Sequence, residues 1–425
     1  MKLGLERMHE LLKKLDHPER RIGRVVHVAG TNGKGSTVAM LAALVRASGS
    51  RVATYTSPHL STLRERIQID GVLASEDAIV AAAARVDAAG GADLTFFEQV
   101  TAIGLCVIAE ANVDVSILEV GLGGRLDATN AVDAPVAVVT GVAMDHEQIL
   151  GDTLAAIAGE KAGIFKRRQR VVIGASGEPA AVPLLVEHAR AVGVDHITVI
   201  DDAAIASVPP VALAGAHQRA NAAAALAALD ELHLACDRIG VLARVSHPGR
   251  FEIAGELILD GAHNPHGARA LAATLREQEL RPSLVIAVSS DKDARAIAEA
   301  LAPEVSAVVA TRYQQERALD PEALADVFRS VISSRSAPTS LSPGLRSAAS
   351  FGAAEPAVVA AAHHRAPAIP VDTAPDLEAA VAAARAHGTP VLVAGSLFLV
   401  GEARTRFLGA PTDPIVATES LARRD

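Results

Sequence analysis

The chain has 425 residues, half of them hydrophobic, so two or three domains with a large core are expected and wholesale disorder is excluded. The 49 acidic residues outnumber the 40 basic ones and only 2 % of the residues are aromatic, which argues against nucleic-acid or anionic-membrane binding. Two cysteines fit a reducing compartment better than a disulfide scaffold. We find neither an apolar run of membrane-spanning length nor a signal peptide, and we expect a cytoplasmic protein.

Short β-branched runs alternate with alanine-rich helical stretches along the first half of the chain. An amphipathic opening helix is predicted from the spacing of Met8, Leu11, Leu12 and Leu15. Strands are expected at residues 25–29, 51–56, 114–120, 135–141, 170–174 and 196–200. The alternation predicts an N-terminal α/β domain, of the P-loop type, with a doubly wound and mostly parallel sheet over residues 1–245.

A second series of strands and helices follows. Strands are expected at residues 257–260, 284–288, 305–310 and 391–394, and helices at 265–277, 321–328 and 377–386. These elements predict a smaller, Rossmann-like α/β domain over residues 246–425. Residues 333–350 are rich in Ser, Ala and Pro, so we expect a solvated insertion or mobile loop there.

The strongest motif lies between the first buried strand and its helix. It is the phosphate loop, which we define as Gly30, Thr31, Asn32, Gly33, Lys34, Gly35 and Ser36. Glycines let backbone N–H groups approach an anion, the helix N-terminus adds a positive dipole, and the lysine adds a charge. We expect Ser36 and Thr37 to cap the helix. The spacing differs from a standard Walker A motif, and the alternative is a tight turn that needs glycine.

This variant loop resembles that of the ATP-dependent Mur ligase superfamily. Further segments make the chain similar to the folylpolyglutamate synthase and dihydrofolate synthase family, and they stand in the family's order. They are residues 56–60 (TSPHL), 95–98 (TFFE), 119–130 (EVGLGGRLDATN), 145–146 (DH), 159–164 (GEKAGI), 247–250 (HPGR), 259–265 (LDGAHNP) and, more weakly, 394–398 (AGSLF). Residues 333–350 and the tail after about residue 410 have no counterpart in this resemblance.

Three metal-ligand candidates, Ser57, Glu119 and His146, come at or after the ends of strands. Ligands gather at the carboxyl ends of the strands in an open α/β sheet, so these side chains could meet. The resemblance implies one Mg²⁺ on Ser57 and Glu119 and a second on Glu119 and His146, with Lys161 carbamylated to N6-carboxylysine as a further ligand; a monovalent cation is another candidate. Taken alone, Glu119 could be a charge facing water, His146 a loop histidine and Lys161 a helix-surface lysine.

The resemblance also implies which groups bind ATP together with the phosphate loop. They are Asn221 and, from the C-terminal domain, Arg250 and Asp260. Catalysis would then require the domains to close, which excludes water from a hydrolysable intermediate. The alternative for Asn221 is a helix cap. We assign no role to His263 and Asn264, although both match the family motif.

Two segments match those that bind the folate or pteroate part of the substrate in the family. They are Thr95, Phe96, Phe97 and Glu98, and Leu126, Asp127 and Ala128. An aromatic pair suits a flat pterin ring, and a carboxylate can pair with its amino-pyrimidine edge. The phenylalanines could equally be core residues. Residues 61–71 fit the family's substrate-side loop.

The reaction implied by the resemblance is an ATP-dependent amide ligation through an acyl phosphate. L-Glutamate would be joined to dihydropteroate, to a reduced folate and its polyglutamates, or to both, with Lys34, Glu119, His146 and Lys161 as catalytic groups. We expect a monomer. One alternative is a Mur-type ligase for a cell-wall precursor. Another is a P-loop ATPase without ligase activity, which would leave residues 260–265 unexplained.

Overall fold

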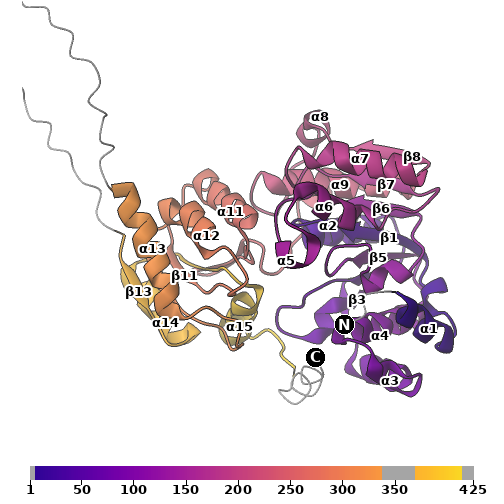
Figure 1. Ribbon diagram of the computed structural model, residues 1–425, viewed down its shortest axis with the longest axis horizontal. Helices are drawn as coiled ribbons and strands as arrows, with labels where there is room; N and C mark the ends of the chain where they lie inside the picture. The colour runs from indigo at the N-terminus through magenta and orange to yellow at the C-terminus, as the bar shows by residue number, and fades with distance from the viewer. Residues whose placement is uncertain (1–4, 337–368, 414–425) are drawn as a thin grey trace, which may run out of the picture.

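The computed structural model describes residues 5–336 and 369–413 and arranges them in two lobes, each built around one sheet (Figure 1). The N-terminal sheet has the order β4-β3-β2-β5-β1-β6-β7-β8. Its strands are β1 (Arg24–Ala29), β2 (Val52–Tyr55), β3 (Ile67–Ile69), β4 (Val72–Leu73), β5 (Val115–Glu119), β6 (Val136–Val139), β7 (Arg170–Ile173) and β8 (His196–Val199). Neighbouring strands are parallel across β2, β5, β1, β6, β7 and β8, which confirms the predicted doubly wound sheet, whereas β3 and β4 pair antiparallel at one end.

Helices cover both faces of this sheet. They are α1 (Glu6–Lys14), α2 (Lys34–Ala47), α3 (Glu76–Ala88), α4 (Phe96–Glu110), α5 (Glu147–Leu150), α6 (Leu154–Ala162), α7 (Ala181–Val192), α8 (Asp202–Ala206), α9 (His217–Glu231) and α10 (Arg238–Leu242), with 3₁₀ turns η1 (Pro18–Arg20), η2 (Leu63–Arg66), η3 (Gly91–Asp93) and η4 (Ala128–Ala131). On one face, α2 and α9 pack together over Val26 and Val28 of β1. On the other, α6 and α7 cover Ala137 and Val139 of β6. Buried parallel strands explain the continuous apolar runs in the sequence.

The C-terminal sheet has the order β13-β12-β11-β14-β10-β9, and only β9 runs antiparallel to its neighbour. The strands are β9 (Glu252–Ala254), β10 (Leu257–Leu259), β11 (Ser283–Ile286), β12 (Ala307–Ala310), β13 (Val371–Thr373) and β14 (Val391–Ala394). The helices are α11 (Pro265–Glu277), α12 (Ala294–Leu301), α13 (Pro321–Ser336), α14 (Leu377–His387) and α15 (Leu397–Leu408), with the 3₁₀ turn η5 (Ala302–Glu304).

Several local predictions need correction. Residues 61–71 are not simply a loop, because η2 and β3 lie there and β3 pairs with β4 around Asp70 and Gly71, both with positive φ. An Asp-Gly pair between β-branched residues is a hairpin signal that could have revealed this turn. β9 precedes β10, so Asp260 follows the second strand of its lobe, not the first. Of the insertion expected at residues 333–350, the part up to 336 ends α13 and the rest lies outside the described residues.

The boundary at residue 245 stays a prediction. α10 packs on α2 of the N-terminal lobe, while β9 already belongs to the C-terminal sheet. Among the helices of residues 5–336 and 369–413, none combines the length and the apolar character needed to cross a membrane.

Candidate active site

A cavity of about 860 Å³ lies where the two lobes meet. Its wall contains every residue that the sequence predicted for ATP or metal. These are the phosphate loop, Ser57, Glu119, His146, Lys161, Asn221, Arg250 and Asp260. Groups separated by more than two hundred residues are therefore brought to one place by the carboxyl ends of the strands in both sheets.

The phosphate loop connects β1 to α2 at one side of this cavity. Gly33 has a φ of +83°, and a Cβ there would lie 2.2 Å from Oδ1 of Asn221, so only glycine fits. The Lys34 ammonium donates to the carbonyl oxygens of Gly30 at 3.1 Å and Thr31 at 3.3 Å. The first amides of α2 have no partner within the helix and are free for an anion.

The expected helix cap is wrong. α2 begins at Lys34 with Gly33 as its N-cap, and no side chain caps it. Ser36 and Thr37 are instead buried within the first turn. The glycine, not a hydroxyl, therefore defines the start of this helix, which leaves its N-terminus open toward the cavity.

Ser57 and Glu119 stand together after β2 and at the end of β5. The Ser57 amide donates to Oε2 of Glu119 at 3.3 Å. Glu119 is only 5 % exposed, and burial raises the pKa of its carboxyl group although the nearby Lys34 charge lowers it. The Ser57 hydroxyl is buried without a hydrogen-bond partner in the described chain. The alternative of a water-facing Glu119 is therefore wrong.

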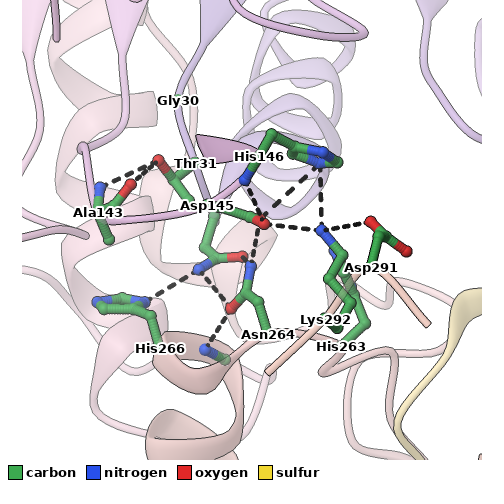
Figure 2. A network of polar contacts seen from close by, with 12 residues as sticks. Gly30, Thr31, Ala143, Asp145, His146, His263, Asn264, His266, Asp291 and Lys292 are labelled. Carbon is green, nitrogen blue, oxygen red and sulfur yellow. Dashed lines mark hydrogen bonds and ion pairs between the residues drawn. The ribbon is translucent and has the colours of Figure 1, made fainter. Parts of the chain in front are cut away.

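His146 follows β6 and is linked to the C-terminal lobe through its neighbour Asp145 (Figure 2). Asp145 Oδ1 accepts from the His146 amide at 2.9 Å and from the Lys292 ammonium at 2.7 Å. Nε2 of His146 lies 3.4 Å from Nζ of Lys292. Burial alone would raise the pKa of Asp145, but His146 and the hydrogen-bonded Lys292 outweigh it and hold that pKa below its usual range.

A pair of asparagines extends this contact between the lobes. Asn32 and Asn264 donate to each other's side-chain oxygens at 3.2 Å. Asn264 also donates to Oδ2 of Asp145 at 2.7 Å. Its side-chain oxygen accepts from the Gly267 amide, and Asn264 thereby caps the N-terminus of α11. The phosphate loop therefore contacts the start of a C-terminal helix directly.

Lys161 is buried in the cavity wall, so the alternative of a helix-surface lysine is wrong. It lies in the last turn of α6 and is 4 % exposed. Burial, and then the nearby Lys34 charge, lower the pKa of its ammonium group to about 7. A large share of Lys161 is therefore neutral amine at physiological pH.

The three nucleotide candidates beyond the phosphate loop occupy different settings. Asn221 is inside α9, where it accepts from Ser176 at 2.7 Å and donates to Gln218 at 3.0 Å, so it is not a helix cap. Arg250 donates to the carbonyl oxygen of Gly249 at 2.9 Å. The Asp260 carboxylate accepts the amides of Phe251 at 2.8 Å and Ala262 at 2.9 Å.

The folate candidates lie behind the cavity wall instead of in it. Thr95 and Glu98 form a capping box at the start of α4. Phe97 lies under the wall residue Gly121, where a Cβ would come within 2.5 Å of its ring. Phe96 and Phe97 both pack against a core cluster of the N-terminal lobe, with the Arg66 guanidinium carbon 5.6 Å from the centre of the Phe96 ring.

Asp127 stabilises the same part of the cavity wall through hydrogen bonds to its backbone. Its Oδ2 accepts the amides of Gly121 and Leu122 at 3.0 Å, and its Oδ1 accepts the amide of Thr129 at 3.0 Å and its hydroxyl at 2.5 Å. Leu126 is half-buried and Ala128 is buried at the start of η4. Both oxygens of Asp127 are thus occupied, which favours a role in shaping the loop after β5.

Sequence reasoning assigned no role to Asp145, Lys292 or His247, which all line the cavity. Lys292 comes shortly after β11, and its position beyond a strand end is a signal that could have found it. Nε2 of His247 would lie 2.8 Å from a Cβ on Gly35, so this side chain covers the phosphate loop. Burial, followed by Arg250, lowers the pKa of His247 to about 3.

Comparison with known proteins gives two domain families. Residues 28–199 match the Mur ligase middle domain, and residues 249–397 match the Mur ligase glutamate ligase domain. The chain is 37 % identical to the dihydrofolate synthase/folylpolyglutamate synthase of Mycobacterium tuberculosis, covering 76 % of this chain and 77 % of that protein. It is 36 % identical over its whole length to a probable bifunctional folylpolyglutamate synthase/dihydropteroate synthase of Haloferax volcanii, of which it spans 51 %.

Solved structures agree in fold over nearly the whole chain. Escherichia coli FolC in complex with DHPP and ADP has a TM-score of 0.77 and 29 % identity, covering 100 % of this chain and 95 % of that one. A Yersinia pestis bifunctional folylpolyglutamate synthase/dihydrofolate synthase with AMPPNP and a Mn ion has a TM-score of 0.78 and 30 % identity, covering 95 % of this chain and 93 % of that one. The chain spans about half the length of the probable bifunctional folylpolyglutamate synthase/dihydropteroate synthases of Haloferax volcanii and Halobacterium salinarum.

Proposed function

We propose that this chain, which belongs to the folylpolyglutamate synthase/dihydrofolate synthase family of the Mur ligase superfamily, is an ATP-dependent ligase that adds L-glutamate to dihydropteroate, to reduced folates, or to both. The observation that carries the proposal is the cavity that the two lobes share. One wall is the phosphate loop, and the other carries Arg250 and Asp260 of the C-terminal lobe. Relatives with both names, and one bound to ADP and DHPP, support this substrate class.

The proposed reaction has two steps. A carboxylate oxygen of the acceptor attacks the γ-phosphorus of ATP, the bond to the β-phosphate oxygen breaks, and ADP leaves. The amine of L-glutamate then attacks the acyl carbon of the resulting acyl phosphate, inorganic phosphate leaves, and the nitrogen gives up a proton. Closure of the lobes keeps water from the acyl phosphate.

Lys34 and the amides of the phosphate loop are the first groups that act on the nucleotide. In the described conformation the Lys34 ammonium is held by two loop carbonyls, so it needs to shift only locally to meet a phosphate oxygen. There it would stabilise negative charge on the transferring phosphoryl group. The Asn32–Asn264 and Asp145–Lys292 contacts keep the second lobe over this loop.

The donor set near Glu119 suits a divalent cation. The unpartnered Ser57 hydroxyl beside a buried carboxylate offers hard oxygen ligands, which is the chemistry that Mg²⁺ prefers. Ser57 and Glu119 would hold one ion, and Glu119, His146 and carbamylated Lys161 a second. A bound ion would supply compensation for phosphate charge. In the described part of the chain, no three His, Cys, Asp or Glu side chains form a ready cluster, and a carbamate on Lys161 would add an oxygen ligand to the second site.

Lys161 is suited to carbamylation because only the neutral amine reacts with carbon dioxide. Burial provides that form, since the pKa of the side chain falls to about 7. The reaction releases a proton and leaves an anionic carbamate near the Lys34 charge, so an attraction takes the place of the repulsion that a protonated Lys161 would have. We therefore retain N6-carboxylysine at position 161 as part of the proposal, and a monovalent cation and a monomeric state as predictions.

The deciding experiment measures phosphate release with ATP and L-glutamate, comparing dihydropteroate with a tetrahydrofolate. We expect release that depends on glutamate and on one or both acceptors. A nucleotide-linked muramyl acceptor serves as the control for a Mur-type ligase. ATP turnover that is independent of glutamate would instead identify an ATPase and refute the proposal.

A further inference from the structure

Beyond α15 the chain crosses from the C-terminal lobe to the N-terminal lobe (Figure 1). We call residues 409–413 the strap. At its end the Asp413 carboxylate receives two hydrogen bonds, from the Thr62 hydroxyl to Oδ1 and from the Leu63 amide to Oδ2, both at 2.6 Å. Thr62 is the N-cap of η2 and only 2 % exposed. The strap therefore binds a partly buried turn that belongs to the other lobe.

The turn is part of a loop, residues 57–66, that forms one side of the cavity. Ser57, Pro58, Leu60 and Glu65 of this loop line the cavity wall. Within the loop, Glu65 accepts the amides of Leu60 at 2.7 Å, residue 61 at 3.1 Å and residue 62 at 3.3 Å. Asp413 takes the next amide in sequence, so the internal carboxylate and the strap together satisfy a continuous run of donors.

α15 holds the same loop from the same lobe. Its Gly401 approaches so closely that a Cβ would lie 1.9 Å from the Leu60 carbonyl oxygen, and its carbonyl accepts from the Ser61 hydroxyl at 3.3 Å. Pro411 of the strap itself lines the cavity. α15 and the strap therefore contact the loop at Leu60, Ser61, Thr62 and Leu63.

The two ends of the loop lead to different parts of the site. At its start, the Ser57 amide is held by Glu119, which does not involve the strap. At its end, the Arg66 guanidinium stacks over Phe96 behind the cavity wall, in the segment to which the sequence resemblance assigns the acceptor. Loosening the middle of the loop would therefore disturb the acceptor side more than the nucleotide side.

We infer that Asp413 is a positioning residue for the acceptor and holds loop 57–66 in place from the opposite lobe. Its expected effect on acceptor turnover rests on the proposed function. The Asp413 side chain need not touch substrate. It acts through the two donors of η2, and because it is attached to the C-terminal lobe it links the order of this loop to closure of the lobes.

The first test needs no ligand. Hydrogen exchange is measured at the backbone amides of residues 60–66 in the wild-type chain, in Asp413→Ala and in Asp376→Ala. Asp376 is the matched control because its carboxylate also accepts a backbone amide at the start of a helix, that of Ala379 at 2.9 Å, but away from the cavity. Exchange in this loop should accelerate by about tenfold in Asp413→Ala alone. Unchanged exchange would overturn the inference.

The second test separates positioning from simple stability. In Asp413→Ala the KM for the acceptor should rise about threefold or more, while kcat and the KM for ATP stay within about twofold. If this variant does not fold, Asp413→Asn, which keeps one acceptor oxygen, should show the same pattern with a smaller rise. An unchanged acceptor KM, or equal changes for both substrates, would contradict the inference. Absence of glutamate-dependent turnover in the wild-type chain would refute the proposed function. Hydrogen exchange would then still test whether Asp413 holds loop 57–66 in place.

Discussion

The two lobes treat their buried polar groups differently where they meet the cavity. On the N-terminal side the Ser57 hydroxyl has no partner within the described chain, burial raises the pKa of Glu119, and burial lowers that of Lys161. On the C-terminal side burial also raises the pKa of Asp260, but its carboxylate already receives two amides, and Lys292 is paired with Asp145.

A buried polar group without a partner lowers stability, and one that lines a cavity, as the Ser57 hydroxyl does, is available to a ligand. Under the proposed function, this contrast predicts that the N-terminal lobe carries the chemistry and that the C-terminal lobe provides closure and support. Substitutions in the first lobe should reduce turnover with little loss of stability. Substitutions in the second should change affinity and closure.

The largest effect is expected at Lys34. Lys34→Met removes the charge that faces the phosphates but keeps a long side chain in the helix, so kcat should fall by about 100- to 1000-fold. Steady-state phosphate release measures this loss, and a thermal melt checks that the fold is kept. Lys34→Arg retains a charge and is expected to be less impaired. Full turnover in Lys34→Met would remove the phosphate loop from the mechanism.

Lys161→Met should reduce kcat by about 100-fold, because a neutral side chain cannot provide the carbamate oxygens. The adduct itself is measured by ¹³C NMR with labelled bicarbonate. Since the pKa of Lys161 is about 7, the neutral amine, and with it the adduct signal, should increase from pH 6 to pH 8 at constant dissolved carbon dioxide.

Lys166 provides a matched control for that signal. Burial also lowers its pKa, but its ammonium donates to the carbonyl oxygen of Asn130 at 3.1 Å and it does not line the cavity. Lys166→Met should keep the carbamate resonance. A resonance that survives in Lys161→Met would place the modification elsewhere, as would electron density without an extra carboxyl group on Lys161.

The sequence allowed most of the strands to be predicted because buried parallel strands are nearly continuous apolar runs. Val136–Val139 and Val391–Ala394 are examples, since both are fully buried. β3 and β4 were missed because both are short and contain polar or exposed residues, with β4 at the edge of the sheet and β3 next to it.

In the candidate site, too, some residues could be predicted from the sequence and others could not. Lys34 could be predicted because its role follows from a local strand–loop–helix context. Asp413 could not, since its partners lie about 350 residues away and become neighbours only when the lobes meet. For Lys292 the position after a strand end was visible, but its pairing with Asp145 was not, because that residue lies 147 residues away. The burial of Lys161 was equally invisible, because it depends on the packing of α6 and not on its own sequence.

Ser57→Ala tests the orphaned hydroxyl. Turnover should fall between about 10- and 100-fold, the range for weakening a metal site, while stability is unchanged or slightly higher because no hydrogen bond is lost. Thr311→Val is the matched control, since the Thr311 hydroxyl is also buried without a partner but lies outside the cavity wall. It should leave turnover unchanged. A clear loss of stability in Ser57→Ala would show that the hydroxyl is bonded within the fold.

The smallest effect is expected for the pair that joins the lobes. Lys292→Met leaves Asp145 without its counter-ion, so kcat/KM should fall about tenfold, or ~1.4 kcal/mol, because closure becomes less favourable. Arg276→Met, which breaks an exposed ion pair within the C-terminal lobe, should stay within about twofold.

A double-mutant cycle then decides what Lys292 does. If it acts by holding Asp145, adding Asp145→Asn to Lys292→Met should cost little more, since the uncompensated carboxylate is gone. Small-angle scattering should show both variants to be more open than the wild-type chain. Additive losses with an unchanged degree of closure would mean that Lys292 acts on the reacting groups themselves. The C-terminal lobe would then take part in the chemistry, which would contradict its assignment to closure and support alone.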